Sequence, residues 1–101
     1  MAERTAILRI VEEDENVIHA VVQTSIGEVT VMANMVREPH RLLLNQIHIE
    51  GKGLTRVIIK KAANELGIKE GVGEVVLQDG VRTSGANLGS IPKPIFVEVD
   101  Q

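Results

Sequence analysis

The chain has 101 residues, of which 44% are hydrophobic and 25% are charged, and its formal net charge is -3. A chain of this length encloses one hydrophobic core, so we expect a single domain over residues 1–101, and the acidic balance argues against a nonspecific nucleic-acid binder. The absence of cysteine excludes a disulfide framework, a thiolate nucleophile and a cysteine-based zinc site, and a single aromatic residue, Phe96, makes the predicted core aliphatic.

Three strands are predicted at the start of the chain, at Thr5–Val11, Asn16–Thr24 and Glu28–Val36. Each is short and rich in β-branched residues, and the connecting stretches "EEDE" and "SIG" are typical of turns. We therefore expect an antiparallel meander. The acidic run Glu12–Glu15 is interpreted as a solvated hairpin tip, because four consecutive carboxylates in a short turn cannot all face one metal ion.

A fourth strand is predicted in "RLLLNQIHIEG", after "REPH" breaks the pattern at Pro39. Simple alternation divides this strand into two faces. One face would carry Leu42, Leu44, Gln46, His48 and Glu50, and the other Leu43, Asn45, Ile47 and Ile49. Three polar side chains would then lie in a row near the end of the strand.

One helix is predicted, from Leu54 to Leu66, because its apolar residues recur at helical spacing. Gly53 or Thr55 would cap its start, and Gly67 would stop it. Its polar face carries Arg56 and Lys60 one turn apart; taken alone, this pattern is typical of a solvated helix face.

Two further strands are predicted, at Gly73–Gln78 and Pro94–Asp100. The resulting order β-β-β-β-α-β-β predicts an α+β domain with a mixed sheet of about six strands and one helix on one face. The crossover through the helix favours a parallel pairing of Ile47–Glu50 with Val75–Gln78. Their carboxyl ends would then meet where the helix begins and where the loop Asp79–Lys93 leaves the sheet.

That loop is longer than a hairpin needs, and ligands of such sheets bind at the carboxyl ends of the strands. We therefore expect an anion-binding site there. The turn "GKG" would contribute backbone N–H groups, and a fork-shaped cation, hydroxyls and an amide would come from the loop. The predicted ligands are Gly51, Lys52, Gly53, Arg56, Arg82, Thr83, Ser84 and Asn87. Taken alone, "GKG" is more often a plain glycine turn that leads into a helix.

The motifs "HIEG" and "RTSGANLGS", separated by a helix and a strand, resemble the C-terminal domains of Rhs-type polymorphic toxins. The resemblance covers about Leu43–Val99, with Ser84 and Leu88 where the family pattern has Thr and Pro. The matching positions are His48, Glu50, Arg82, Thr83, Gly85 and Asn87. A toxin-like domain is what this resemblance implies.

Two classes of function remain open. In the first, the residues permit metal-independent attack on an RNA phosphodiester, with His48 as general base or acid, Glu50 as its partner, Arg82 neutralising charge and Thr83 positioning an oxygen. In the second, the chain is a non-catalytic homodimeric binding or assembly module. A weaker similarity of "IEGKGLTRVII" to N-acetyltransferases adds an acyl-CoA binder as a third interpretation.

We expect no metal and no cofactor, because the sequence lacks a metal-ligand cluster and a nucleotide fingerprint. The predicted partners are RNA or another phosphate-bearing ligand and a second copy of the chain, since the edges of an open sheet must be managed. The charged N-terminal stretch and the lack of a long apolar run predict a cytoplasmic chain with no signal peptide and no membrane span.

Overall fold

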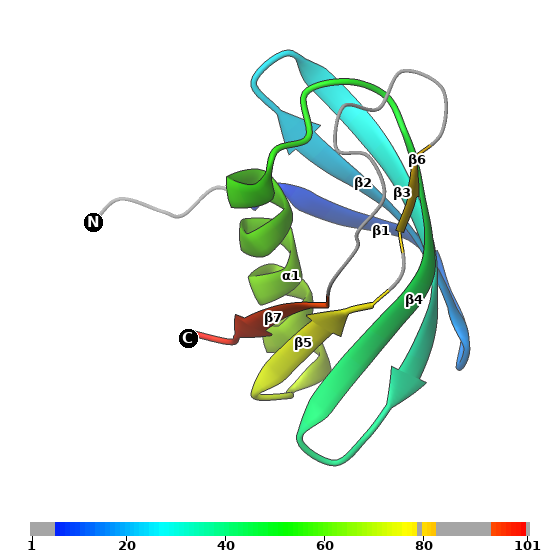
Figure 1. Cartoon of the computed structure of the whole chain (residues 1–101), viewed down its shortest axis with the longest axis vertical. Helices are drawn as coiled ribbons and strands as arrows, with labels where there is room; N and C mark the ends of the chain where they lie inside the picture. The colour runs from blue at the N-terminus through cyan, green and yellow to red at the C-terminus, as the bar shows by residue number, and fades with distance from the viewer. Residues whose placement is uncertain (1–5, 79, 83–93, 101) are drawn as a thin grey trace.

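The computed structural model describes residues 6–78, 80–82 and 94–100, and of residues 80–82 it describes the backbone alone. Seven strands and one helix follow one another along this part of the chain (Figure 1): β1 Leu8–Glu13, β2 Val17–Thr24, β3 Gly27–Arg37, β4 Arg41–Glu50, α1 Arg56–Glu70, β5 Glu74–Leu77, β6 Gly80–Arg82 and β7 Ile95–Glu98. The predicted α+β class, with one mixed sheet and one helix, is confirmed. The short strand β6 is an addition, since it falls within the segment predicted to be a loop.

One sheet contains all seven strands, in the order β1-β2-β3-β4-β5-β7, with β6 beside β4. The first three form the predicted meander and β4 extends it, β5 runs parallel to β4, and β7 runs antiparallel to β5. The parallel pairing joins Arg41–Leu44 to Glu74–Leu77, so the predicted pairing of Ile47–Glu50 with the strand after the helix is wrong. β5 is too short to extend that far, and Ile47–Ile49 pairs with Gly80–Arg82 instead.

The sheet curls around α1, and the helix lies close to both outer strands (Figure 1). Two neighbouring helix residues hold opposite edges of the sheet. The Glu65 carboxylate accepts the N–H groups of Ile7 and Leu8, at 2.9–3.1 Å, where β1 begins. The Asn64 amide accepts the N–H of Asp100 at 2.6 Å and donates to its carbonyl at 3.2 Å, just beyond β7. One helical turn thus ties together the strands that are farthest apart in the sheet.

The core lies between the concave face of the sheet and the buried side of α1. Its side chains are aliphatic, as predicted, and the largest fully buried ones are Leu42, Ile47, Ile49, Leu54, Val29 and Val75. Burying each such side chain contributes roughly 1.5–3 kcal/mol. An apolar cavity of about 50 Å³ remains between helix and sheet, where alanines from both layers line it: Ala20, Ala33, Ala62 and Ala63.

The helix begins and ends later than predicted. Thr55 is its N-cap, because the Thr55 Oγ1 accepts the N–H of Ile58 at 3.2 Å. The predicted stop at Gly67 is wrong: the helix continues past it to Glu70, and its C-cap is Gly71, whose φ of 74° suits a C-terminal glycine. Gly67 is buried inside the helix, where a Cβ atom would collide with Val99.

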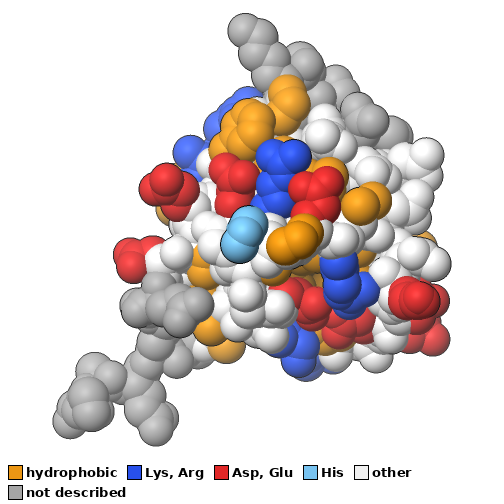
Figure 2. All heavy atoms as spheres, turned by 90° about the horizontal axis from the view of Figure 1, so that it is seen from below, with side chains coloured by type: hydrophobic (Ala, Val, Ile, Leu, Met, Phe, Trp, Pro, Cys, Tyr) orange, Lys and Arg blue, Asp and Glu red, His pale blue; other side chains and the backbone are white. Residues whose placement is uncertain are grey.

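Arg37, at the end of β3, holds the turn between β1 and β2 against α1. It donates to the Glu15 carbonyl at 2.6 Å, to Glu13 Oε2 at 3.1 Å and to Glu70 Oε1 at 3.1 Å. Glu13 is therefore an exception to the predicted solvated hairpin tip. Figure 2 views the molecule from this end, where acidic and basic side chains are interspersed.

Glu13 and Glu70 form an interacting carboxyl pair beside this arginine. A hydrogen bond with Glu70, together with burial, raises the pKa of Glu13. Burial alone would raise the pKa of Glu70, but hydrogen bonds with Glu13 and Arg37 outweigh it and lower that pKa. When only one of the two carboxyl groups carries a proton, that group is therefore Glu13, and Glu70 is ionised.

Candidate functional site

β4 contains a bulge that changes which of its side chains face the core. Its pairing with β3 shifts register in the middle of the strand, where Gln46 adopts a left-handed φ of 49°. Leu42 and Leu44 before the bulge, and Ile47 and Ile49 after it, are all buried. The predicted uniform alternation is therefore wrong, since it placed the two leucines opposite the two isoleucines.

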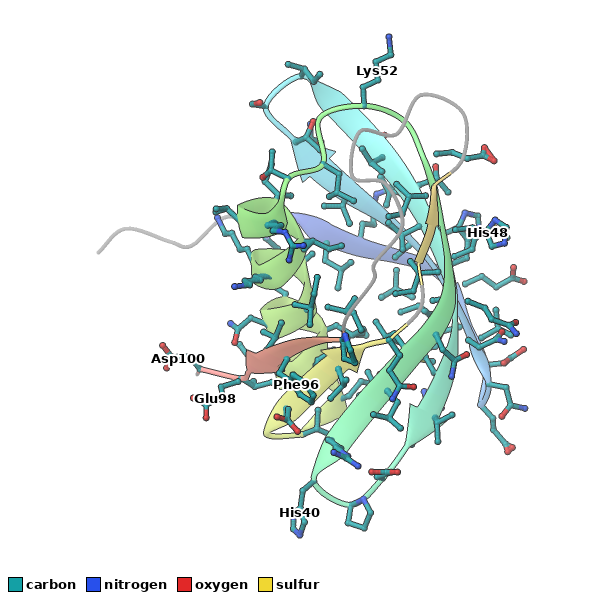
Figure 3. The ribbon with its side chains drawn as sticks, in the orientation of Figure 1. His40, His48, Lys52, Phe96, Glu98 and Asp100 are labelled. Atoms are coloured by element: carbon teal, nitrogen blue, oxygen red, sulfur yellow. The ribbon has the colours of Figure 1, made fainter. Side chains whose placement is uncertain are left out.

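The predicted polar row is nevertheless present, because Gln46, His48 and Glu50 are all exposed. His48 points away from α1, on the convex side of the sheet (Figure 3). In the pairing of β4 with β3, His48 lies opposite Met32, and Glu50 lies opposite Thr30. His48 is thus open to a ligand rather than covered by apolar side chains, as a catalytic base or acid requires.

β6 brings the start of the "RTSGAN" stretch beside the end of β4. Val81 pairs with His48, and Arg82 pairs with Ile49, in parallel register. The backbone of Arg82 therefore lies on the strand next to His48 and Glu50, at the spacing of adjacent strands, about 4.8 Å. The Arg82 side chain and the other predicted loop ligands lie outside the described part of the chain: Thr83, Ser84 and Asn87.

Backbone conformation and close packing explain why the turn Gly51–Lys52–Gly53 has glycine at its first and last positions. Their φ angles are 126° and 100°, which side chains rarely adopt. A Cβ atom on Gly51 would lie 3.1 Å from the Glu28 carbonyl oxygen, and one on Gly53 would lie 2.5 Å from Thr24 Oγ1. The turn therefore packs on the β2–β3 hairpin, while Lys52 projects into solvent at the end of the molecule (Figure 3).

The two predicted helix cations lie apart from His48. Arg56 begins α1 on the concave side of the sheet, whereas His48 points from the convex side (Figures 1 and 3). Lys60, one turn further along, lines a groove between α1 and β7. The structure thus brings together His48, Glu50 and the Arg82 backbone, and it does not bring Arg56 and Lys60 to them.

Two polar features of the convex face were not predicted as part of a site. Asn34 Nδ2 donates to Gln46 Oε1 at 2.7 Å, which bridges β3 and β4 at the bulge. His19 on β2 pairs with Met32 from the other side, so two histidines flank this methionine on one face. The alternation of each strand predicts its exposed residues, but only the strand pairing places them in one row.

No protein-family model, curated protein or solved structure matches the chain. The similarity to Rhs-type toxin domains therefore stays a prediction. Residues 6–78, 80–82 and 94–100 contain no group of three or more His, Cys, Asp and Glu side chains placed to hold a metal ion. In the same part of the chain, no helix has the length and apolar character needed to cross a membrane.

Proposed function

We propose that the protein binds a phosphate group of RNA at the edge formed by the carboxyl ends of β4 and β6, and cleaves the phosphodiester there without a metal ion. The pairing of Arg82 with Ile49 carries this proposal. It supports a site in which the Arg82 backbone lies one strand away from an exposed His48. The residue of β6 that pairs with His48 is Val81, so the proposal requires the Arg82 guanidinium to reach the phosphate around the carboxyl end of β6. Arginine holds phosphate through two parallel hydrogen bonds, and histidine exchanges protons near neutral pH.

In this scheme the substrate supplies its own nucleophile. The RNA 2′-hydroxyl attacks the adjacent phosphorus, His48 takes its proton, and the bond to the 5′ oxygen breaks. The 5′ oxygen gains a proton from solvent, so the products are a 2′,3′-cyclic phosphate and a 5′-hydroxyl end. Arg82 neutralises the charge that develops on the phosphate, Thr83 positions one of its oxygens, and Glu50 orients His48.

The composition of the site sets the expected strength of binding. No aromatic side chain other than Phe96 exists to stack on bases, and Phe96 lies on β7, away from this edge. Affinity must therefore come mainly from phosphate contacts, with Lys52, two residues beyond the end of β4, as a second cation. We expect weak binding that falls steeply as salt concentration rises and shows little preference for base sequence.

The experiment compares two exposed histidines on the same chain. His40 lies between β3 and β4, at the opposite end of the molecule from Lys52 (Figure 3). Cleavage of a single-stranded RNA is followed in EDTA for His48→Gln and His40→Gln. We expect His48→Gln to lower the rate by about 10²–10⁴-fold, the usual contribution of a general base, and His40→Gln to leave it unchanged. Equal rates for the two variants would contradict the proposal.

Binding is tested separately with a 2′-deoxy oligonucleotide, which cannot supply the nucleophile. Arg82→Ala should abolish its binding while leaving the melting temperature within a few degrees, whereas His48→Gln should bind as the unchanged chain does. If RNA is bound by the unchanged chain but never cleaved, the non-catalytic binding module becomes the better account. If Arg82→Ala lowers stability and leaves binding intact, Arg82 is a structural clasp.

A further inference from the structure

β7 presents an unpaired strand edge. It pairs antiparallel with β5 on one side, and the N–H of Val99 donates to the Gly73 carbonyl at 2.9 Å in the same register. Antiparallel pairs alternate between hydrogen-bonded and non-hydrogen-bonded, so the N–H and C=O groups of Phe96 and Glu98 point away from β5. Among the described residues, these four groups have no hydrogen-bond partner.

The two ends of this edge are closed by different means. At one end, Asn64 already occupies the outward N–H and C=O of Asp100, as a neighbouring strand would. At the other end, Pro94 has no N–H to donate. The open stretch is therefore limited to Phe96 and Glu98, which suits a short pairing of defined register.

Among the described residues, β1 carries protection along its edge, whereas the middle of β7 carries none. β1 has a bulge between Ile10 and Glu12, and Glu65 holds its first residues. Bulges and covering side chains are the usual means of blunting a sheet edge. The pairing of β7 shows no such irregularity, and its Phe96 side chain is 59% exposed although it is the only aromatic residue of the chain.

A groove runs between this edge and α1. Its described lining includes cations from the helix and acids from the strand: Lys60, Lys61, Asn64, Phe96, Val97, Glu98 and Asp100. Figure 3 shows how Phe96 and Glu98 follow one another along β7, with Asp100 just beyond its end. Both signs of charge are thus present within one groove.

We propose that β7 pairs with β7 of a second copy of this chain, antiparallel about a two-fold axis at Val97. In this register Phe96 exchanges two hydrogen bonds with Glu98 of the partner subunit, and Glu98 exchanges two with the partner subunit's Phe96. All four outward groups are then satisfied. The two Phe96 side chains become diagonal neighbours on one face, within the reach of aromatic rings.

A second copy fits this edge better than an unrelated peptide for two reasons. The pairing is self-complementary, because each copy contributes the same edge with the same two open residues, Phe96 and Glu98. It also buries the exposed Phe96 of both copies at once. The result is one continuous sheet across two subunits, with the RNA edge of β4 and β6 left free.

The oligomeric state tests this inference. Light scattering after size exclusion should give a mass that rises from 11.0 kDa towards twice that value as concentration increases. Phe96→Lys should weaken association by about tenfold or more, because it places a charge at the centre of the pairing. The matched control Ile26→Lys changes an apolar residue that is 70% exposed in the β2–β3 turn, and its association should be unchanged.

Hydrogen exchange of two backbone amides gives a readout that does not depend on a variant. The N–H groups of Phe96 and Glu98 should be protected at high concentration and should exchange rapidly after dilution. A mass of 11.0 kDa up to about 1 mM would overturn the inference. So would a dimer that Phe96→Lys leaves intact, or amides that exchange rapidly at every concentration. Phe96→Lys should still cleave RNA, so failure here is distinguishable from failure of the proposed function.

Discussion

Replacing Gly67 with alanine sets helix propensity against packing. Alanine in a helix interior is favoured over glycine by about 1 kcal/mol. The added Cβ would collide with Val99 Cγ2 and lie 3.1 Å from Val75 Cγ2, and Val75 is fully buried. Overpacking of this kind costs about 1–3 kcal/mol, so we predict that Gly67→Ala lowers the free energy of unfolding by up to about 2 kcal/mol.

The prediction is checked by urea unfolding followed by far-ultraviolet circular dichroism, since the chain has no Trp or Tyr. On a Val99→Ala background the collision is removed, so Gly67→Ala should become neutral or stabilising. Gly71→Ala is the matched control: no atom lies within 4 Å of its Cβ position, but its φ is 74°. It should cost about 1–2 kcal/mol in both backgrounds. An equal cost of Gly67→Ala in both backgrounds would refute the packing argument.

Four further predictions concern the stability of the fold. Thr55→Ala should lower the free energy of unfolding by about 1 kcal/mol in urea, because the N–H of Ile58 loses its cap. The raised pKa of Glu13 means that stability falls as pH rises from the ordinary carboxyl pKa through the raised value, so Glu13→Gln should stabilise the protein at neutral pH. Glu70 has a lowered pKa, so its ionised carboxylate stabilises the fold at pH values above its ordinary pKa. This stabilisation is lost as pH falls through the lowered pKa, so Glu70→Gln should lower the free energy of unfolding at neutral pH. Melting curves at a series of pH values decide between these opposite signs. Finally, Ala33→Val should fill part of the cavity under α1 and raise the free energy of unfolding by about 1 kcal/mol, with a decrease indicating that the site is already full.

Local patterns predicted the elements well, because short β-branched runs and one amphipathic stretch dominate this chain. They gave wrong predictions where the sequence offers two residues, or two segments, that suit the same structural role. Gly67 and Gly71 both suit a helix end, and only the contact with Val99 shows that the first is needed for close packing. Similarly, the parallel pairing expected at the end of β4 is made by β6, because β5 stops at Leu77.

The candidate site was predictable in part for the same reason. The bulge in β4 has a signal in the sequence, since the apolar spacing changes phase between Leu44 and Ile47. Strand alternation predicted that His48 and Glu50 share a face. It could not show that Arg56 begins on the other side of the sheet, because that depends on the curvature that wraps the sheet around α1.

The central claim is that phosphate binds at the edge shared by β4 and β6. Its most direct test is a titration of isotope-labelled protein with a 2′-deoxy oligonucleotide, followed by amide chemical shifts. We predict saturable shifts at His48, Glu50 and Arg82, which weaken as salt is raised, with none at His40. Shifts confined to the start of α1 around Arg56, or none that saturate, would contradict the assignment of the site to β4 and β6.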